Sequence, residues 1–407
     1  MLVALVCAWG GGCYRTEHSN PLDGHSSLLF ADEEGPSLIQ PDGAEQWYAG
    51  TTQQIIWGTG HRSADTTVSL RLSIDDGQTY PYEIASRVPN RGTYAWPVPD
   101  LPSKQCRVQV VGATTRGASH ASFSILRKPV PRQMTTGGGE WPSWRGDRLA
   151  FMSDRTGNSD VWVLNIESNQ LVQVTTDPHF DGYPAWDKKG LHLAFTSART
   201  GRNEVWASSL FFDARATQTQ IQLTTTGGEQ SSWQPLPASK KLAYLSPLFG
   251  QFDLATLEFS LPLSSSSVIT APRLLTDDGG KIKPVWVIRT SDNTNIIYFQ
   301  TVRQMFGSTE IQTIQADAAF ALPNSLSLPF TSPVRHPAVS PSGTRLAVSV
   351  DGDIWIVPLA EGRVTGAPLQ VTFDPAAEDV PDWSTDRDLA FQSRQTGQWE
   401  IWTIRVP

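Results

Sequence analysis

The segment Asp177-Pro178-His179-Phe180-Asp181 has potential metal ligands at close spacing. Two carboxylates and an imidazole within five residues have the chemistry to hold a divalent cation if the loop curls around it. No other histidine lies nearby in the sequence, so a solvated loop is the favoured interpretation. Asp181 and Glu140 are also the carboxylates on which a hydrolytic activity would depend.

Motifs of common enzyme classes are absent from the sequence. It contains no Gly-x-Ser-x-Gly, no His-Glu-x-x-His and no phosphate-binding glycine loop. Acidic residues before three aromatic strands recur together with arginines, and we interpret them as structural pairs. These acids are Asp160, Glu204 and Glu400, and the arginines are Arg155, Arg199 and Arg394. We therefore expect no catalytic residue, no metal and no cofactor.

The charge and the cysteines limit the function further. The 407 residues carry a formal net charge of -8, which argues against a nucleic-acid-binding protein because such a protein needs a basic surface. Of the three cysteines, Cys7 and Cys13 lie in the first segment. Cys106 lies in an alternating strand pattern, which predicts a buried thiol without a disulfide partner.

A unit of 40 to 50 residues recurs six times in the C-terminal two thirds of the chain. Its anchors are spaced 42, 47, 53, 53 and 44 residues apart, and proline precedes five of them by two positions. The anchors are Trp144, Trp186, Trp233, Trp286, Val339 and Trp383. Short apolar strand patterns follow each anchor, and a threonine signal ends four of the units. Four short strands per unit predict the blades of a six-bladed β-propeller.

This repeat resembles the propeller of TolB, of the Tol–Pal system, and its WD-repeat-like relatives. The resemblance covers about two thirds of the chain, 132–407. The last unit lacks the threonine-signal strand, and an unpaired copy, Arg132-Gln133-Met134-Thr135, precedes the first unit. We predict that this copy pairs as the outer strand of the sixth blade and closes the ring.

The preceding segment, 37–128, predicts seven or so short strands in an antiparallel sandwich. Val68 to Ile74 alternates strictly, and Asp75-Asp76-Gly77 predicts a hairpin turn. With Gly92-Thr93-Tyr94-Ala95-Trp96, these motifs resemble extracellular Ig-like modules of bacterial secreted proteins. The resemblance implies a spacer or adhesion module without catalysis. Three tryptophans of this segment could stack on sugar rings: Trp47, Trp57 and Trp96. Because they lie at strand positions, packing in the core is the favoured interpretation.

The first 13 residues resemble a bacterial lipoprotein signal. An apolar run from Leu2 to Trp9 is followed by three glycines and Cys13, which this resemblance makes the lipidated residue. Residues 14–36 are polar and predict a flexible tether. Tyr14 replaces the aspartate that often retains lipoproteins at the inner membrane, so the outer membrane is favoured.

The candidate binding residues lie on one predicted face of the propeller. The loops before the anchor strands and the Arg-Thr-Gly loops emerge there because neighbouring strands alternate in direction. The partner-binding candidates are Glu140, Trp141, His179, Phe180, Asp181, Leu248, Phe249, Phe252, Met305 and Phe306. We expect a lipid-anchored, non-catalytic envelope protein that binds another protein. Two alternatives remain open: a glycan- or cell-wall-binding protein using Trp141, Phe180, Tyr183 and Trp399, and an envelope hydrolase.

Overall fold

The computed structural model describes residues 36–59, 65–209, 219–236, 240–247, 250–264, 271–303, 308–318 and 321–407. Every regular element in these ranges is a β-strand. The predicted signal, Cys13 and nearly all of the predicted tether lie outside them. The chain divides into two compact units, Met1–Arg127 and Lys128–Pro407. Among the described residues, no helix has the length and apolar character of a membrane span.

The first unit consists of two sheets around one apolar core. The smaller sheet has the order β1 (Ser37–Gln40), β3 (Thr52–Gly58), β6 (Thr93–Pro97). The larger has the order β2 (Gln46–Tyr48), β9 (Phe123–Leu126), β7 (Ser103–Val111), β4 (Thr67–Ser73), β5 (Tyr82–Pro89), with β8 (Arg116–Ala118) also on β7.

The tryptophans of the first unit belong to this core. The ring of Trp47 lies 5.9 Å from that of Trp96 and 5.0 Å from that of Phe123, and Trp57 is buried as well. These rings are therefore packing groups, which leaves no exposed sugar platform among them. Cys106 is buried without a disulfide partner, as predicted.

One strand pair in this unit differs from the predicted antiparallel arrangement. β2 and β9 run parallel, with Trp47 opposite Ile125. The two strands stand almost eighty residues apart, so no hairpin forces them to be antiparallel.

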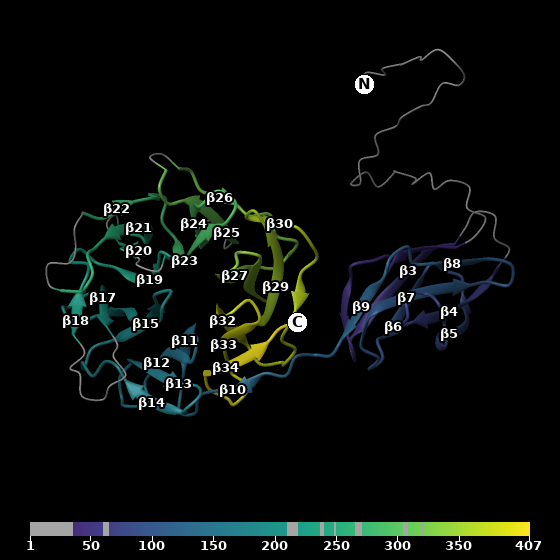
Figure 1. Ribbon diagram of the computed structural model, residues 1–407, viewed down its shortest axis with the longest axis horizontal. Helices are drawn as coiled ribbons and strands as arrows, with labels where there is room; N and C mark the ends of the chain where they lie inside the picture. Colours follow the sequence, from purple (N-terminus) through teal and green to yellow (C-terminus); the bar gives the residue numbers. More distant parts are fainter. Residues whose placement is uncertain are drawn as a thin grey trace, which may run out of the picture. The chain divides into compact units, whose positions relative to one another are not determined.

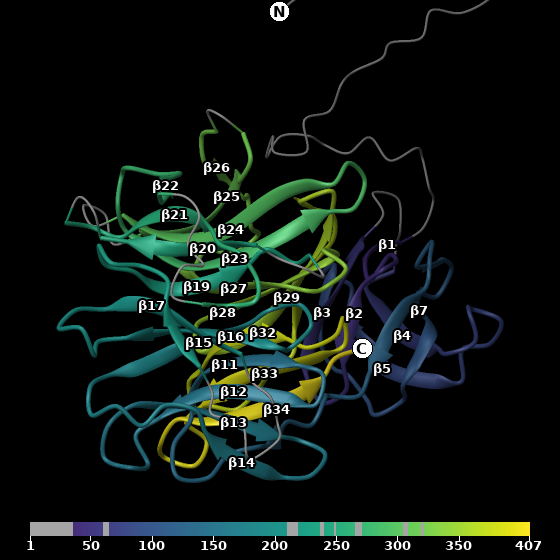
Figure 2. The same ribbon diagram turned by 60° about the vertical axis from the view of Figure 1, so that its left-hand side comes forward.

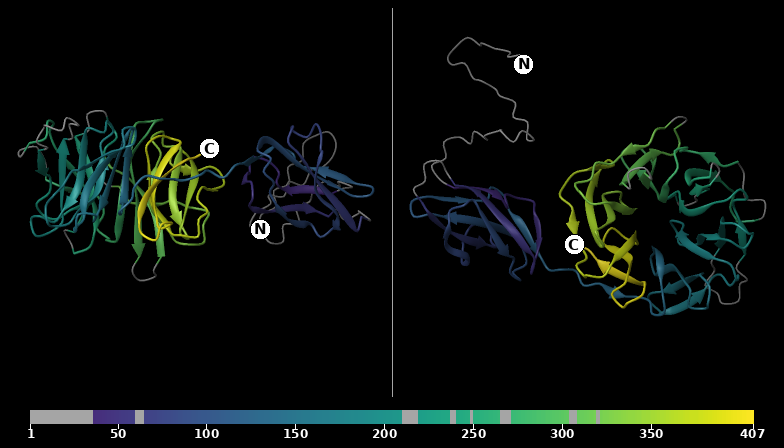
Figure 3. Two further views of the ribbon diagram at one scale, coloured as in Figure 1. Left: turned by 90° about the horizontal axis from the view of Figure 1, so that it is seen from below. Right: turned by 180° about the vertical axis from the view of Figure 1, so that it is seen from behind.

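The second unit contains six sheets arranged around a common axis (Figures 1 and 3). The first three are β11 (Glu140–Arg145), β12 (Arg148–Ser153), β13 (Asp160–Asn165), β14 (Gln170–Gln173); β15 (Asp181–Trp186), β16 (His192–Ser197), β17 (Glu204–Ser209), β18 (Gln220–Gln222); and β19 (Glu229–Trp233), β20 (Lys241–Ser246), β21 (Asp253–Glu258), β22 (Arg273–Leu274).

The remaining three sheets continue the pattern. They are β23 (Lys281–Arg289), β24 (Thr294–Arg303), β25 (Ser308–Gln315), β26 (Asn324–Ser325); β27 (Val334–Val339), β28 (Arg345–Val350), β29 (Asp353–Ala360), with β30 (Arg363–Val364) and β31 (Leu369–Gln370) both on β29; and β32 (Glu378–Trp383), β33 (Asp388–Ser393), β34 (Glu400–Arg405), β10 (Arg132–Gln133). In the first four sheets the strands follow one another in chain order, as β11 to β14 do in Figure 2, whereas β10 is the outer strand of the sixth sheet. This architecture is a β-propeller.

Apolar side chains of adjacent sheets pack against one another and hold the ring together. The second strand of each sheet is mostly buried, for example Leu149-Ala150-Phe151 at 0% exposure. The core between the second and third sheets joins Val205 and Leu223 to Trp233 and Tyr244. Neither face of such a sheet is left for solvent, which explains the unbroken apolar runs in the sequence.

The threonine signal marks a buried clamp inside the sheets. The Thr175 hydroxyl donates to Asp160 at 3.0 Å and accepts the N–H of Val161 at 2.9 Å. The same pairing joins Thr224 to Glu204 at 2.6 Å and Thr276 to Asp253 at 2.9 Å. The hydroxyl thus forms hydrogen bonds with both a buried carboxylate and a buried backbone N–H. Leaving either of these groups without a hydrogen-bond partner would cost free energy.

In the sixth sheet this clamp joins the two ends of the ring. β10 pairs with β34, Arg132 lying opposite Thr403, which is the pairing predicted from the sequence. Thr135 then donates to Glu400 at 2.6 Å and accepts the N–H of Ile401 at 2.8 Å. Both side chains of this clamp are buried.

Replacing Thr135 with valine should therefore destabilise the whole propeller. Glu400 and the Ile401 N–H lose a buried partner, and we expect the free energy of unfolding to fall by about 2 kcal/mol in urea titrations. Thr136→Val, at the exposed neighbour, is the matched control and should have little effect. Equal stability of the two variants would contradict a role for the clamp in closure.

Candidate functional site

The six inner strands share a kink that sets what faces the axis. In each, one non-glycine residue has a left-handed backbone with φ between 46° and 51°, and the register shifts there as in a β-bulge. These residues are Trp141, Tyr183, Gln230, Lys283, His336 and Val380. Each stands three positions before its anchor, so the conformation belongs to the repeat. We refer to these six residues as the bulge ring.

Hydrogen bonds from the neighbouring sheets hold the bulge ring. The N–H of Trp141 donates to Gln392 at 2.9 Å, and that of His336 donates to Gln300 at 3.0 Å. The N–H of Lys283 donates to the side chain of Gln230 at 2.8 Å. Each acceptor belongs to the preceding sheet, so the kinks couple the sheets around the axis.

Aromatic side chains of the bulge ring gather at one end of the axis. The Trp141 ring packs edge to face against Tyr183 at 4.7 Å and against His336 at 5.4 Å. Phe180 extends this group, with its ring 5.5 Å from that of Tyr183. His336 is fixed by Asp379 at 2.6 Å; although burial raises the pKa of Asp379, His336 lowers it to about 2.

The predicted binding residues on this rim have different environments. Glu140, Trp141 and Phe180 are half-buried and His179 is exposed, with its Nδ1 2.8 Å from Asp177. Burial and the nearby Asp154 raise the pKa of Glu140, while Arg394 opposes this. Phe252 is 37% exposed. Leu248, Phe249, Met305 and Phe306 lie outside the described residues, so the apolar loop patch stays a prediction.

Asp181 is fully buried, unlike the exposed binding residue that we predicted. Its two carboxylate oxygens accept from Nη2 of Arg199 at 3.0 and 3.1 Å. Burial raises the pKa of Asp181, and bonds from Ser197 and Arg199 oppose the shift. The carboxylate is therefore a structural partner of Arg199. The described residues contain no group of three or more metal-ligating side chains in suitable geometry.

The predicted pairing of the strand acids with the loop arginines is wrong for direct ion pairs; burial lowers the pKa of Arg155, and the charge of Glu400 opposes this shift without such a pair. Asp160 bonds to Thr175, and Glu204 pairs with Arg202 at 2.8 Å. The arginines instead lie over aromatic rings, as Arg199 does over Trp206 at 4.6 Å. Trp399 likewise faces Arg394 at 4.6 Å and does not join the Trp141 group. The acids are occupied by the threonine clamp, which the sequence pattern did not reveal as their partner.

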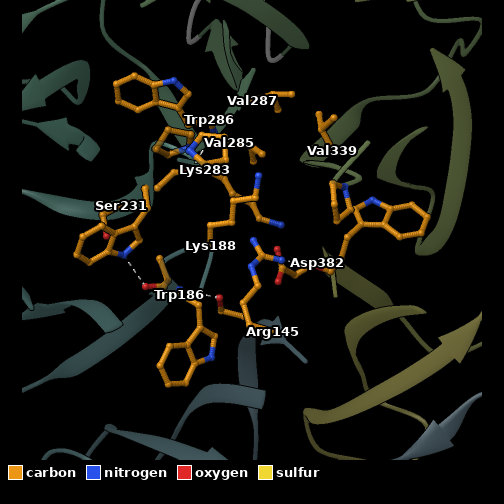
Figure 4. A pocket seen from close by; sticks show the side chains of 18 of the residues that line it. Arg145, Trp186, Lys188, Ser231, Lys283, Val285, Trp286, Val287, Val339 and Asp382 are labelled. Atoms are coloured by element: carbon orange, nitrogen blue, oxygen red, sulfur yellow. Dashed lines mark hydrogen bonds between the residues drawn. The ribbon is translucent and has the colours of Figure 1, made fainter. Parts of the chain in front are cut away.

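A cavity of about 520 Å³ occupies the centre of the propeller. Trp141 and Tyr183 line it at one end, and loops between the first and second strands line it at the other, with Lys188 and Asn293 among them. Figure 4 shows the side chains of Arg145, Lys188, Lys283 and Asp382 pointing into this space. Sequence reasoning missed all four. They stand at different offsets from their anchors, so no repeated position in the sequence marks them.

Backbone groups form hydrogen bonds with three of the charged side chains that line the cavity. Nη1 of Arg145 donates to the carbonyl of Trp383 at 2.7 Å, and Nζ of Lys283 donates to that of Pro381 at 2.5 Å. Asp382 accepts the N–H of Trp144 at 2.7 Å. Desolvation lowers the pKa of Lys283 to about 8, although Asp382 and Asp379 oppose the shift.

A second electrostatic feature comes from a difference in residue type between the second and the sixth sheets. Glu378 begins β32 as Asp181 begins β15, but Gln395 stands where Arg199 stands in the second sheet. Gln395 donates to Glu378 at 2.8 Å and brings no charge. Burial raises the pKa of Glu378 to about 7; Thr372 and Gln395 oppose the shift, and Asp353 and Asp374 add to it.

The stability of the propeller should therefore fall as the pH rises from about 4.5 to about 7. The unfolded chain ionises Glu378 in this window while the folded chain keeps the proton, so the loss reaches at most about 3 kcal/mol from this group. Gln395→Arg should remove this loss by pairing with the ionised carboxylate, and Glu378→Gln should remove it by abolishing the titration. Urea titrations at acidic and alkaline pH measure the effect. An unchanged pH dependence in both variants would contradict the assignment.

Comparisons with known proteins extend only to solved structures. No family model and no curated protein matches the sequence. Similar structures include TolB from Acinetobacter baumannii, at 11% identity and TM-score 0.40 over 84% of this chain and 64% of that chain. A gluconolactonase from Xanthomonas campestris has 14% identity and TM-score 0.47 over 69% of this chain and 90% of that chain. An auxiliary nutrient binding protein from Bacteroides thetaiotaomicron has 11% identity and TM-score 0.47 over 92% and 98%.

These similarities bear on the fold alone. The match spans less than two thirds of the length of the Acinetobacter TolB. All three TM-scores are below 0.5, so the β-propeller architecture rests on the ring of sheets itself, and function has to be argued from the residues.

Proposed function

We propose that this chain is a non-catalytic binding protein of the bacterial cell envelope. In this proposal 37–128 is an Ig-like module, and 132–407 is a six-bladed, TolB-like propeller that binds a protein partner. A lipid on Cys13 anchors the chain, with the outer membrane favoured and 14–36 as tether. The partner lands on the rim formed by Glu140, Trp141, His179 and Phe180.

The aromatic group at the rim carries this proposal. Half-buried rings that are held rigidly and bordered by charged groups are typical of the centres of protein interfaces. Trp141 is held by its left-handed backbone and by contacts with Tyr183 and His336. It needs no ordering when a partner arrives, which lowers the entropic cost of binding.

The alternatives are less well supported by the same geometry. A sugar-binding platform needs exposed ring faces, whereas Trp141 packs edge to face with two neighbours. A hydrolase acting through Asp181 would need that carboxylate to be accessible, whereas Asp181 is fully buried and bonded to Arg199, which leaves only the half-buried Glu140 for this role. These contacts favour a protein partner over a glycan and over envelope-polymer hydrolysis.

Substitution at the rim should release the partner without unfolding the propeller. We expect Phe180→Ala combined with His179→Ala to abolish co-purification of the partner from mildly solubilised envelopes. Leu191→Ala is the control, because Leu191 is 44% exposed in a loop between first and second strands. Retention by the rim variant, or an equal loss in the control, would contradict the proposed surface.

The anchor is tested separately by Cys13→Ser. Metabolic labelling with a fatty acid should mark the wild-type chain and fail on this variant, which should also leave the membrane fraction. Cys13 is the only lipidation site in the proposal, so persistent labelling of the variant would refute the proposed anchor.

A further inference from the structure

The cavity at the centre of the propeller carries a charge opposite to that of the chain. Three cations, Arg145, Lys188 and Lys283, share it with one carboxylate, Asp382 (Figure 4). The chain as a whole has a formal net charge of -8. Four different sheets supply the inner strands or adjoining loops that bring these side chains together. The side chains that line the cavity thus carry a formal excess of two positive charges, in a protein that is acidic as a whole.

The cations keep donors available for a ligand. Nη1 of Arg145 is bonded to two backbone carbonyls, which fixes a guanidinium that has three further N–H groups. Nζ of Lys283 donates to one carbonyl, and an ammonium has three donors. Lys188 is exposed. Asp382 is bonded to the Trp144 N–H, which turns one of its two oxygens toward the backbone.

Holding three cations together in a confined space costs free energy that an anion would recover. Desolvation penalises the buried ammonium of Lys283, and repulsion among the three cations adds to the penalty. The lowered pKa of Lys283 is consistent with this environment. A divalent metal ion would be repelled by the same groups, and a neutral ligand would not offset their charge.

We propose that the central cavity binds a small organic or inorganic polyanion bearing carboxylate or phosphate groups. A volume of about 520 Å³ is within the usual range for small-molecule sites. The ligand enters from the face of the loops between first and second strands, where Lys188 lies, because Trp141 and Tyr183 occupy the opposite end. Trp141 borders both this site and the rim that we propose for the protein partner, but none of the three cations is a rim residue.

Calorimetric titration of the full chain with citrate and, separately, with inorganic phosphate tests the site. All solutions are matched in ionic strength with sodium chloride. The wild type should bind at least one probe, and Lys188→Glu should weaken binding by about tenfold or more because it reverses one of three attracting charges. Comparing the two probes shows whether carboxylate or phosphate is the preferred group.

Lys189→Glu is the matched control. It makes the same charge change one residue along the chain, at an exposed lysine that does not line the cavity. This variant should bind as the wild type does. No binding of either probe by the wild type would overturn the proposal. An unchanged affinity in Lys188→Glu would also overturn the proposal. So would an equal loss of affinity in Lys189→Glu, because that result would show a general effect of net charge.

The pH dependence of citrate binding gives an independent measure. Arg145, Lys188, Asp379 and Asp382 are the other charged groups around Lys283, whose own proton is lost near pH 8 because burial lowers its pKa. Citrate is fully ionised there, so affinity should fall as the pH rises through this value in the wild type. Lys283→Gln should bind more weakly and show no such fall. A wild-type affinity that is flat with pH would exclude Lys283 from the site and contradict the proposal as stated.

Discussion

No sheet of this propeller can bury its own two apolar faces. Most residues of each second strand are buried, and each sheet relies on its neighbours for cover, so the arrangement is stable only as a complete ring. The ring must therefore join its first and last strands. It does so through β10 on β34 and through the buried clamp of Thr135 on Glu400. The same clamp appears inside the first three sheets, so closure uses a bond that the repeat already contains.

The kinks of the inner strands are the second consequence of the repeat. A left-handed, non-glycine residue is unfavourable by itself, and it recurs here at the same position of every sheet. Bonds from the preceding sheet, such as Gln392 to the Trp141 N–H, hold it in place. The backbone strain is thus a property of the architecture. The side chains of the kinked residues differ from sheet to sheet. Trp141 and Tyr183 form an aromatic end of the cavity, and Lys283 contributes a cation to its interior.

The repeat could be predicted from the sequence because its signals are local. The anchors, the proline two positions before them and the threonine strand all lie within one unit, and the structure places them as the pattern predicts. The strand acids show the limit of such reasoning. Their recurrence beside arginines suggested ion pairs, but the closest donor is a threonine some twenty residues away, as Thr224 is for Glu204.

The candidate sites were predicted less well, for a related reason. Asp181 was assigned to the surface by its loop position, whereas its pairing with Arg199 depends on how two strands face each other. The cation cluster joins Arg145, Lys188 and Lys283 from three sheets, and no local pattern reports that convergence. Aligning the positions before each anchor would have identified the bulge ring. The parallel pairing of β2 with β9 in the first unit is equally non-local.

The central claim is that the aromatic rim receives a protein. The most direct measurement is photo-crosslinking in living cells, with a photoreactive residue at His179 on the rim and, in a second strain, at Leu191 on the opposite loops. The account predicts one discrete crosslinked protein from position 179 and none from position 191. Crosslinks of equal yield from both positions, or none from position 179, would contradict it.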